Sequence, residues 1–323
     1  MLAAVATRVD RQDPLAGLTV GEWPERAAPP GWATVTVRAA GLNHHDLWTL
    51  RGVGIAADLL PVVLGAEASG VDDHGNEVLV YPVIGDPVAG AGDETLDPAM
   101  ALLSVEHDGT FAQRVSVPRI NLVPKPAGMS FAEAACLPGA WLTAYRMLFE
   151  KSAVPPGGTV LVQGAGGGIA TALVLLGTAA GYRMWVTSRS PERGQRAVRL
   201  GAEAAFPVGA RLPVRVDAVM ETVGAATWEH SLRAVRPGGR VVVCGATSGA
   251  CPRINLSRLF FRQVTVVGST LGTRVQLQRL VRFCEMTGLR PPLHEVLPLH
   301  RAREGFTAMV AGRLFGKIVF MVD

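Results

Sequence analysis

The sequence has few cysteines, and they are not grouped. Four occur among 323 residues, and no two form a C-x-x-C pair. Structural zinc sites and small disulfide scaffolds need cysteines at short, repeated spacings. Their scarcity therefore excludes a cysteine-based metal site and fits free thiols in a reducing compartment. The four residues are Cys136, Cys244, Cys251 and Cys284.

Long apolar runs are also missing. The longest, Ile169–Ala180, is interrupted by Gly177 and is too short to cross a bilayer. The first residues, Met1–Arg8, lack the charged-then-apolar order of a secretory signal. We therefore expect a cytoplasmic protein with no membrane partner.

Clusters of like charge are absent as well. The formal net charge is only +4, and aromatic residues make up 6% of the chain. Nucleic-acid-binding surfaces gather their basic residues on one face, whereas the arginines here are scattered along the chain. We expect no nucleic-acid partner, and the mild positive excess suits an anionic cofactor equally well.

Glycine, by contrast, is concentrated in one informative segment. Thr159–Gln163 has the pattern of a short buried strand, a glycine-dense turn follows it, and an apolar segment typical of a helix continues to Gly177. Glycines in such a turn let the backbone approach a pyrophosphate, which the free N–H groups of the helix N-terminus then bind. We align this nucleotide fingerprint as Ala165-x-Gly167-x-x-Ala170, with alanine at its first and last positions.

The next strand indicates which dinucleotide is bound. Arg183–Thr187 ends about twenty residues after the turn, where a Rossmann unit contacts the adenosine ribose. An acidic residue there would accept hydrogen bonds from the ribose hydroxyls of NAD. The chain has Ser188 and Arg189 instead, a hydroxyl and a guanidinium that suit a 2′-phosphate. This pair predicts NADPH as the cofactor.

The two parts of the chain have different patterns. Residues 1–123 alternate short β-patterned runs with turns, as in Ala33–Arg38 and the hairpin turn Asp72–Asn76, which indicates an antiparallel β domain. Helices at Ser130–Leu137 and Leu142–Phe149 and a βα alternation follow over residues 124–289. Strands are expected there at 159–163, 183–187, 204–206, 217–221, 240–244 and 263–268.

Two further expectations concern the connections and the C-terminus. The segment between Phe206 and Asp217 contains two prolines and is barely long enough for a crossover helix, so it should be an irregular loop. From about Arg290 the pattern predicts a strand, a helix over 301–311, and a last strand over Lys317–Val322.

Together with the glycine turn, six segments resemble the medium-chain dehydrogenase/reductase superfamily in order and spacing, over nearly the whole chain. They are Gly41–Trp48, Leu64–Gly70, Leu137–Tyr145, Val241–Gly249, Val267–Thr270 and Leu314–Val319. The resemblance implies an α/β protein with a GroES-like β-rich catalytic domain (1–123, completed by 290–323) and a doubly wound Rossmann domain (124–289). It also implies that ligands bind in the cleft between the two domains.

The resemblance also carries cofactor contacts onto this chain. His44 and Lys317 are expected near the pyrophosphate, the former because a helix N-terminus favours an anion. A solvated His44 and a strand-edge Lys317 are the alternatives. The complete set of expected cofactor residues is His44, Thr143, Ala165, Gly166, Gly167, Gly168, Ile169, Ser188, Arg189, Val223, Gly245, Ala246, Thr247, Gly268, Ser269 and Lys317.

Zinc is not expected. Catalytic zinc needs three protein ligands and an open position, and the zinc enzymes of this superfamily have a cysteine where this chain has Asn43 and a histidine where it has Ala66. The lobe that carries structural zinc in those enzymes corresponds to Ile84–Val105, which holds no cysteine. The chain therefore resembles the zinc-free quinone- and enone-reductase branch.

The expected catalytic residues follow the first motif segment. Asn43 should begin a helix over His44–Arg51 as its N-cap, with Asp46 completing a capping box, and the resemblance implies that Asn43 also contacts the nicotinamide side of the cleft. The resemblance also implies that His45 stands where the zinc enzymes have a hydroxyl residue that passes the substrate's proton, and an imidazole can act as a general acid near neutrality. A packing histidine is the alternative for His45. Asp46 and Glu67 are expected as buried structural carboxylates.

These observations predict a zinc-independent, NADPH-dependent oxidoreductase that transfers hydride to a conjugated ketone, quinone or enoyl thioester. A zinc-type alcohol dehydrogenase or carbonyl reductase, and an NADPH-binding protein without turnover, are the alternatives. A homodimer is expected from the resemblance, with Gln263–Gly268 as the sheet edge that pairs.

Overall fold

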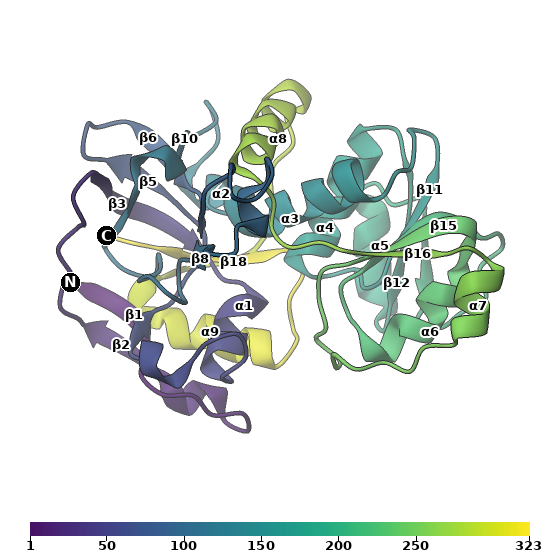
Figure 1. Cartoon of the computed structure of the whole chain (residues 1–323), viewed down its shortest axis with the longest axis horizontal. Helices are drawn as coiled ribbons and strands as arrows, with labels where there is room; N and C mark the ends of the chain where they lie inside the picture. Colours follow the sequence, from purple (N-terminus) through teal and green to yellow (C-terminus); the bar gives the residue numbers. More distant parts are fainter. The chain divides into compact units, whose positions relative to one another are not determined.

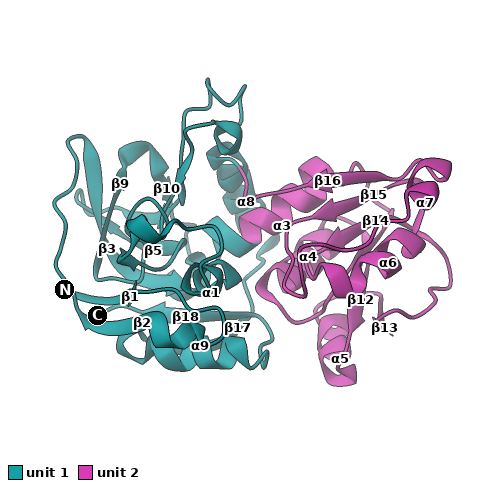
Figure 2. Cartoon of the chain, turned by 60° about the horizontal axis from the view of Figure 1, so that its bottom comes forward, with its two compact units in different colours: residues 1–140, 273–323 teal, residues 141–272 magenta.

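The computed structural model describes all 323 residues, and the chain divides into two compact units (Figure 2). Unit 1 comprises Met1–Ala140 and Thr273–Asp323, and unit 2 comprises Trp141–Gly272. These limits differ from the domain limits expected at residues 124 and 289. The two flanking helices belong to unit 1, because α2 (Phe131–Ala134) packs on its sheet and α8 (Arg274–Thr287) contacts β10.

Unit 1 is built on a seven-stranded sheet in the order β10-β6-β5-β3-β18-β17, with β9 also paired to β3. The pairs are antiparallel except for β17 with β18. The predicted hairpin is confirmed, because β5 and β6 pair around the turn at Asp72. The strands of this sheet are β3 (Trp32–Gly41), β5 (Ala68–Asp72), β6 (Glu77–Val80), β9 (Arg114–Pro118), β10 (Leu122–Pro124), β17 (Leu293–Pro298) and β18 (Lys317–Met321).

Two smaller sheets and four α-helices complete unit 1. They are β1 (Leu2–Ala6), β2 (Leu18–Glu22) and β4 (Val62–Val63) in one sheet, β7 (Val83–Ile84) and β8 (Ala101–Leu102) in the other, and α1 (His44–Leu50), α2, α8 and α9 (Ala302–Val310). The alternating inward residues of β3 and β18 form a core with Phe111, whose ring lies 5.0 Å from that of Phe320. This core fixes the position of the segment between β3 and α1.

Unit 2 has a six-stranded parallel sheet in the order β13-β12-β11-β14-β15-β16, the doubly wound order of dinucleotide-binding domains. All six predicted strands are present. They are β11 (Thr159–Val162), β12 (Arg183–Ser188), β13 (Ala204–Pro207), β14 (Val216–Glu221), β15 (Val235–Val243) and β16 (Thr265–Gly268).

Helices connect these strands, with one exception (Figure 1). The connecting helices are α4 (Gly168–Ala179), α5 (Pro191–Arg199), α6 (Ala225–Ala234) and α7 (Leu256–Phe261), and α3 (Leu142–Tyr145) precedes the first strand. The connection from β13 to β14 has no helix, which confirms the irregular loop expected there.

The helical run before β11 differs from the expectation. Residues Leu137–Trp141 and Arg146–Lys151 form π-helical turns, so the run has a wider winding than two ordinary helices. Such turns release backbone N–H groups from the regular ladder, and they occur often at functional sites. Two of these released groups, Gly139 N and Ala140 N, contribute to the site described below.

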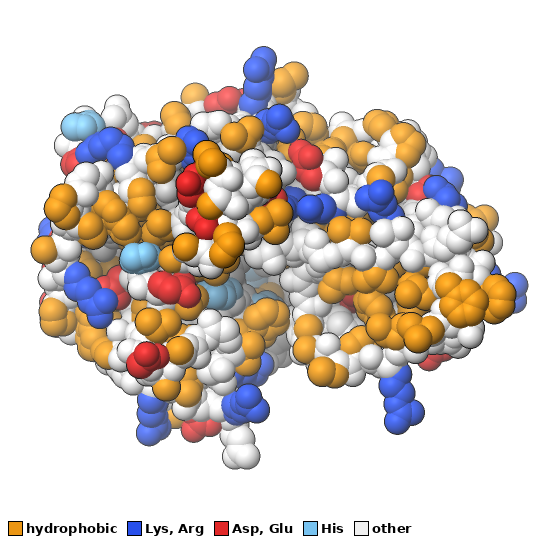
Figure 3. All heavy atoms as spheres, in the orientation of Figure 1, with side chains coloured by type: hydrophobic (Ala, Val, Ile, Leu, Met, Phe, Trp, Pro, Cys, Tyr) orange, Lys and Arg blue, Asp and Glu red, His pale blue; other side chains and the backbone are white.

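The end of unit 2 that holds α7 exposes apolar side chains, which gather there in Figure 3. Leu256, Phe260 and Phe261 of α7 are 64%, 60% and 79% exposed, and Val266 of the edge strand β16 is 41% exposed. No helix of the structure has both the length and the apolar character needed to cross a membrane.

Candidate active site

The parallel strands of unit 2 end in register. Val162 of β11 pairs with Val186 of β12 and Met220 of β14, and the row continues through Val242 and Val267. Open sheets of this kind bind ligands beyond the carboxyl ends of their strands. The structure brings the following expected cofactor residues to that edge: Ala165, Gly166, Gly167, Gly168, Ile169, Ser188, Arg189, Val223, Gly245, Ala246, Thr247, Gly268 and Ser269.

The turn after β11 has the geometry that a pyrophosphate needs. Gly167 is the N-cap of α4, and no side chain caps the helix, so its first N–H groups have no side-chain acceptor. A Cβ atom added at Gly167 would meet nothing within 4 Å, which leaves open space in front of the helix end. An anion of the cofactor can therefore approach these N–H groups.

The structure also explains the alanine at the first fingerprint position. Gly164, one residue before Ala165, has φ +91°, in the left-handed region that favours glycine. The sharp turn is made at Gly164, so Ala165 is free to be an ordinary buried residue. The sharp turn thus lies one residue before the first position of the predicted fingerprint.

Hydrogen bonds fix the loops of this edge to one another. Gly164 N donates to Thr187 Oγ1 at 3.1 Å, and Ser248 N donates to Val223 O at 2.8 Å. Thr143 is buried in α3, which packs on α4.

A buried polar network that sequence reasoning missed lies among these strands. The Glu221 carboxylate, fully buried, accepts hydrogen bonds from Val223 N and Gly224 N at 2.9 Å and from two hydroxyls, of Thr227 at 2.8 Å and Ser231 at 2.5 Å. Donors from four residues thus hold the segment after β14 in place.

The expected ribose segment follows β12. Ser188 Oγ donates to Ser190 O at 2.7 Å and accepts from Ser190 N at 3.1 Å, so this hydroxyl shapes the turn. Arg189 is exposed, and no acidic side chain stands in this turn. The first turn of α5 follows and carries Glu192 and Arg193, neither of which the sequence analysis selected.

In unit 1 the helix α1 begins at His44, as expected. Asn43 N donates to Asp46 Oδ2 at 2.8 Å, which confirms the Asp46 half of the capping box. The other Asp46 oxygen accepts from Gly65 N at 2.9 Å. Burial raises the pKa of Asp46 to about 7. Asp46 and Glu67 are both fully buried, as expected of structural carboxylates.

Lys317 has a role different from the expected pyrophosphate contact. Its side chain is only 3% exposed, and Nζ donates to Leu42 O at 2.6 Å and to Asn43 Oδ1 at 2.7 Å. Nζ also lies 2.5 Å from Glu67 Oε1. The ammonium thus makes two hydrogen bonds and one ion pair, all within unit 1, and none of these contacts involves the turn after β11.

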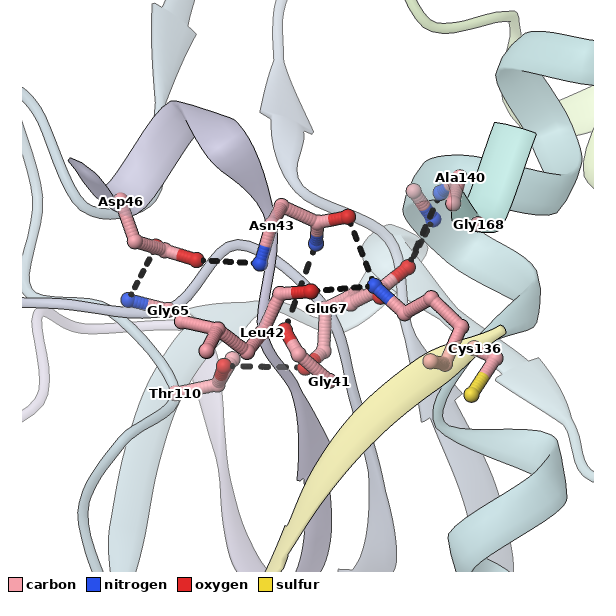
Figure 4. A network of polar contacts seen from close by, with 12 residues as sticks. Gly41, Leu42, Asn43, Asp46, Gly65, Glu67, Thr110, Cys136, Ala140 and Gly168 are labelled. Atoms are coloured by element: carbon pink, nitrogen blue, oxygen red, sulfur yellow. Dashed lines mark hydrogen bonds and ion pairs between the residues drawn. The ribbon is translucent and has the colours of Figure 1, made fainter. Parts of the chain in front are cut away.

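Glu67 joins this network to the π-helical turn. Its Oε2 accepts from Gly139 N at 2.7 Å and from Ala140 N at 3.1 Å. Figure 4 shows Asn43, Asp46, Glu67 and Ala140 in one network of polar contacts. The buried carboxylate is therefore compensated by one cation and two backbone donors.

The two histidines of α1 are both shifted toward the neutral form. Burial lowers the pKa of His45, whose Nε2 is buried without a hydrogen-bond partner. The pKa of His44 is lowered by partial desolvation and then by the charge of Lys317, although the side chain remains exposed. The protonated His45 expected as a general acid is therefore disfavoured near neutral pH, because the charged ring loses its hydration.

The chain matches two family models. Residues 29–127 match the alcohol dehydrogenase GroES-like domain, and residues 168–286 match the zinc-binding dehydrogenase model. With the doubly wound sheet of unit 2, these matches show that the chain belongs to the medium-chain dehydrogenase/reductase superfamily, a class of oxidoreductases.

Individual relatives span nearly the whole chain. A solved NAD-dependent alcohol dehydrogenase is 33% identical, with full coverage of both chains and a TM-score of 0.91. A zinc-type alcohol dehydrogenase-like protein of Schizosaccharomyces pombe is 28% identical over 91% of this chain and 92% of its own length. A crotonyl-CoA carboxylase/reductase of Cereibacter sphaeroides is 28% identical over 82% of this chain and 74% of its own length.

Proposed function

We propose that the protein is a zinc-independent, NADPH-dependent reductase of conjugated carbonyl compounds, such as enones, quinones or enoyl thioesters. The single observation that carries this proposal is the Asn43–Lys317–Glu67 network, because it fills the expected metal-ligand region with an amide and an ammonium. The similarity to a crotonyl-CoA carboxylase/reductase supports a conjugated substrate.

The choice of NADPH rests on the edge of the unit 2 sheet. The turn after β11 fits a pyrophosphate, and Ser188 and Arg189 stand where an acidic residue would select NAD. When bound, NADPH would supply the hydride. Arg189 offers a planar, permanently charged group to a 2′-phosphate.

The reaction requires hydrogen-bond donors from unit 1. Hydride addition to the β-carbon of a conjugated carbonyl leaves negative charge on the carbonyl oxygen, and donors aimed at that oxygen stabilise it. Asn43 can provide such a donor. The Nε2 atom of a neutral His45 has no partner and would provide a second donor after a movement that exposes it to the substrate, because the atom is buried in this structure. Protonation at the α-carbon would complete the reduction.

A metal ion does not fit the side chains of this site. No group of three or more His, Cys, Asp or Glu side chains is arranged to hold one. The Lys317 ammonium lies 2.7 Å from Asn43 Oδ1, and a second cation beside it would be repelled. The amide and the ammonium therefore oppose zinc at this position, despite the name of the family model.

The decisive experiment assays the purified protein with NADPH against a panel of enones, quinones and enoyl thioesters, and with NADP⁺ against a panel of saturated alcohols. We expect oxidation of NADPH by at least one conjugated carbonyl, and no reduction of NADP⁺ by any saturated alcohol. The same rates should persist after treatment with a chelator. Turnover of alcohols alone, together with about one zinc per chain by elemental analysis, would instead identify a zinc-type alcohol dehydrogenase.

That alternative has its own support, because two of the relatives described above are alcohol dehydrogenases by name. A third outcome, NADPH binding without oxidation across the whole panel, would indicate a binding protein without turnover.

A further inference from the structure

We propose that Lys317 is a positioning residue that fixes the Asn43 amide with its oxygen inward and its NH2 group presented to the substrate carbonyl oxygen. The inference rests on the proposed function, because Lys317 acts in that reaction only through Asn43.

The orientation follows from what an ammonium can do. Lys317 Nζ has donors and no acceptor, so the group 2.7 Å from it must be the amide oxygen of Asn43. The two ends of an asparagine amide are nearly equal in size, and only hydrogen bonding distinguishes them. Asn43 Nδ2 then donates to Gly41 O at 3.3 Å, and its second N–H has no acceptor within the protein. The side chain is half-buried, and we assign this second N–H to the ligand.

Lys317 is itself held in place from three sides. Its ammonium contacts Leu42 O, Asn43 Oδ1 and Glu67 Oε1, and Glu67 is anchored by the two amides of the π-helical turn. Gly139 is required for this approach, because a Cβ atom there would lie 2.4 Å from Glu67 Oε2. The amide is therefore oriented by a rigid, buried network.

The same contact makes the amide a better donor. The Lys317 ammonium draws electron density from the Asn43 carbonyl oxygen. Consecutive hydrogen bonds, from the ammonium to the amide and from the amide to the substrate, strengthen one another in a low-dielectric interior. A donor of this kind acts most strongly on the negative oxygen that develops during hydride addition. The contribution of Lys317 should thus appear in kcat and not in the affinity for NADPH.

The test uses a variant that leaves no unpaired buried charge. Lys317→Met combined with Glu67→Gln removes the cation and its partner together. We expect kcat for a conjugated carbonyl to fall about ten- to a hundredfold, the value of one charge-assisted hydrogen bond. The Kd for NADPH, measured by fluorescence titration, should change less than twofold. The matched control is Lys125→Met with Glu77→Gln, another lysine–glutamate pair of unit 1, which should keep kcat unchanged.

Two single variants test each half of the contact. Asn43→Asp keeps an oxygen for Lys317 and removes the N–H donors, so kcat should fall about a hundredfold or more. Lys317→Arg keeps a charged donor at the Asn43 oxygen, so it should retain kcat within about fivefold.

The outcomes separate this inference from the proposed function. A parent protein that reduces no conjugated carbonyl would refute the proposed function, whereas an active parent with an equally active, folded double variant would overturn the inference alone. A rise in the Kd for NADPH with unchanged kcat would also overturn the inference, because it would indicate that Lys317 binds the cofactor pyrophosphate. Should the double variant fail to fold, the single variants decide: any pattern other than loss in Asn43→Asp and retention in Lys317→Arg overturns the inference.

Discussion

His45 is a half-buried residue whose environment decides its chemistry. Burial lowers its pKa, and its Nε2 atom lacks a partner within the protein. The ring should therefore be neutral above about pH 6.5, the ordinary value of histidine. A neutral ring donates a hydrogen bond from one nitrogen, which can hold a carbonyl oxygen without releasing a proton.

This neutral role gives a prediction for substitution and for pH. His45→Ala should lower kcat about a hundredfold, the lower end of what a positioned acid or donor contributes, and His45→Gln should restore most of it. Between pH 7 and 8 the ring does not titrate, so kcat should not change on its account. Equal losses in both variants, with a rate that climbs as pH falls below 6.5, would show that the cation is the acting form.

Asp46 gives a second prediction at the same scale, on stability. Both its oxygens accept hydrogen bonds from backbone N–H groups. In Asp46→Asn the amide NH2 group would face one of these N–H donors, and the free energy of unfolding should fall by about 1–3 kcal/mol. Burial raises the folded-state pKa of Asp46 to about 7, above the unfolded value of 3.8. The folded form thus binds the proton more tightly, and the stability that this gives is full below pH 3.8 and lost as pH rises through about 7.

Urea unfolding of the parent and of Asp46→Asn over pH 4–8 measures this effect. The difference in free energy of unfolding should shrink as pH rises, because only the parent titrates. The exposed Asp58→Asn is the control and should show no such trend. A difference that grows with pH would mean that the carboxylate, held by two N–H groups, has a pKa below its ordinary value.

Among the elements, the end of β12 is where we propose that the cofactor preference is set. Arg189→Ala should weaken NADPH about ten- to a hundredfold and leave NADH nearly unchanged, because one charge-assisted contact is lost. Calorimetric titration of both cofactors measures it. Arg199→Ala, at the opposite end of α5, is the control. An equal loss of affinity for NADPH and NADH would mean that Arg189 has a structural role and does not determine the cofactor preference.

The sequence predicts those elements whose pattern lies within one short segment, and it does not predict contacts between residues far apart in the chain. The strands of unit 2, the glycine turn and the helix at His44 have local patterns, so their positions were predictable. The contact between Lys317 and Leu42 joins residues 275 positions apart, and no local pattern reports it. The π-helical turn at Leu137–Trp141 is equally hidden, because two of its amides bind Glu67, 72 and 73 positions earlier in the chain. The burial that lowers the pKa of His45 arises from the same tertiary packing.

For the whole molecule, we propose a homodimer formed through the open edge of the unit 2 sheet. β16 has a partner only on the β15 side, and Val266 together with the apolar side chains of α7 is exposed beside that edge. An open apolar edge of this kind promotes association, and a second copy of the chain would cover it.

Light scattering should therefore give about twice the chain mass of 34.0 kDa at micromolar concentration. Phe261→Asp should shift the protein toward monomer, because a charge would enter the covered apolar surface. Val88→Asp changes an equally exposed apolar residue of unit 1 and should leave the mass unaltered. A parent that scatters as a 34.0 kDa particle would contradict the proposal.

The Glu221 network has a consequence for the protein before any cofactor arrives. The amides of Val223 and Gly224 are bonded to a carboxylate that solvent does not reach. Their protons should exchange with deuterated solvent slowly even in the free protein, at rates close to those of the sheet interior. The loop would then be ordered in advance, so binding would not have to immobilise it. The entropic penalty of capturing a dinucleotide at this edge is correspondingly small.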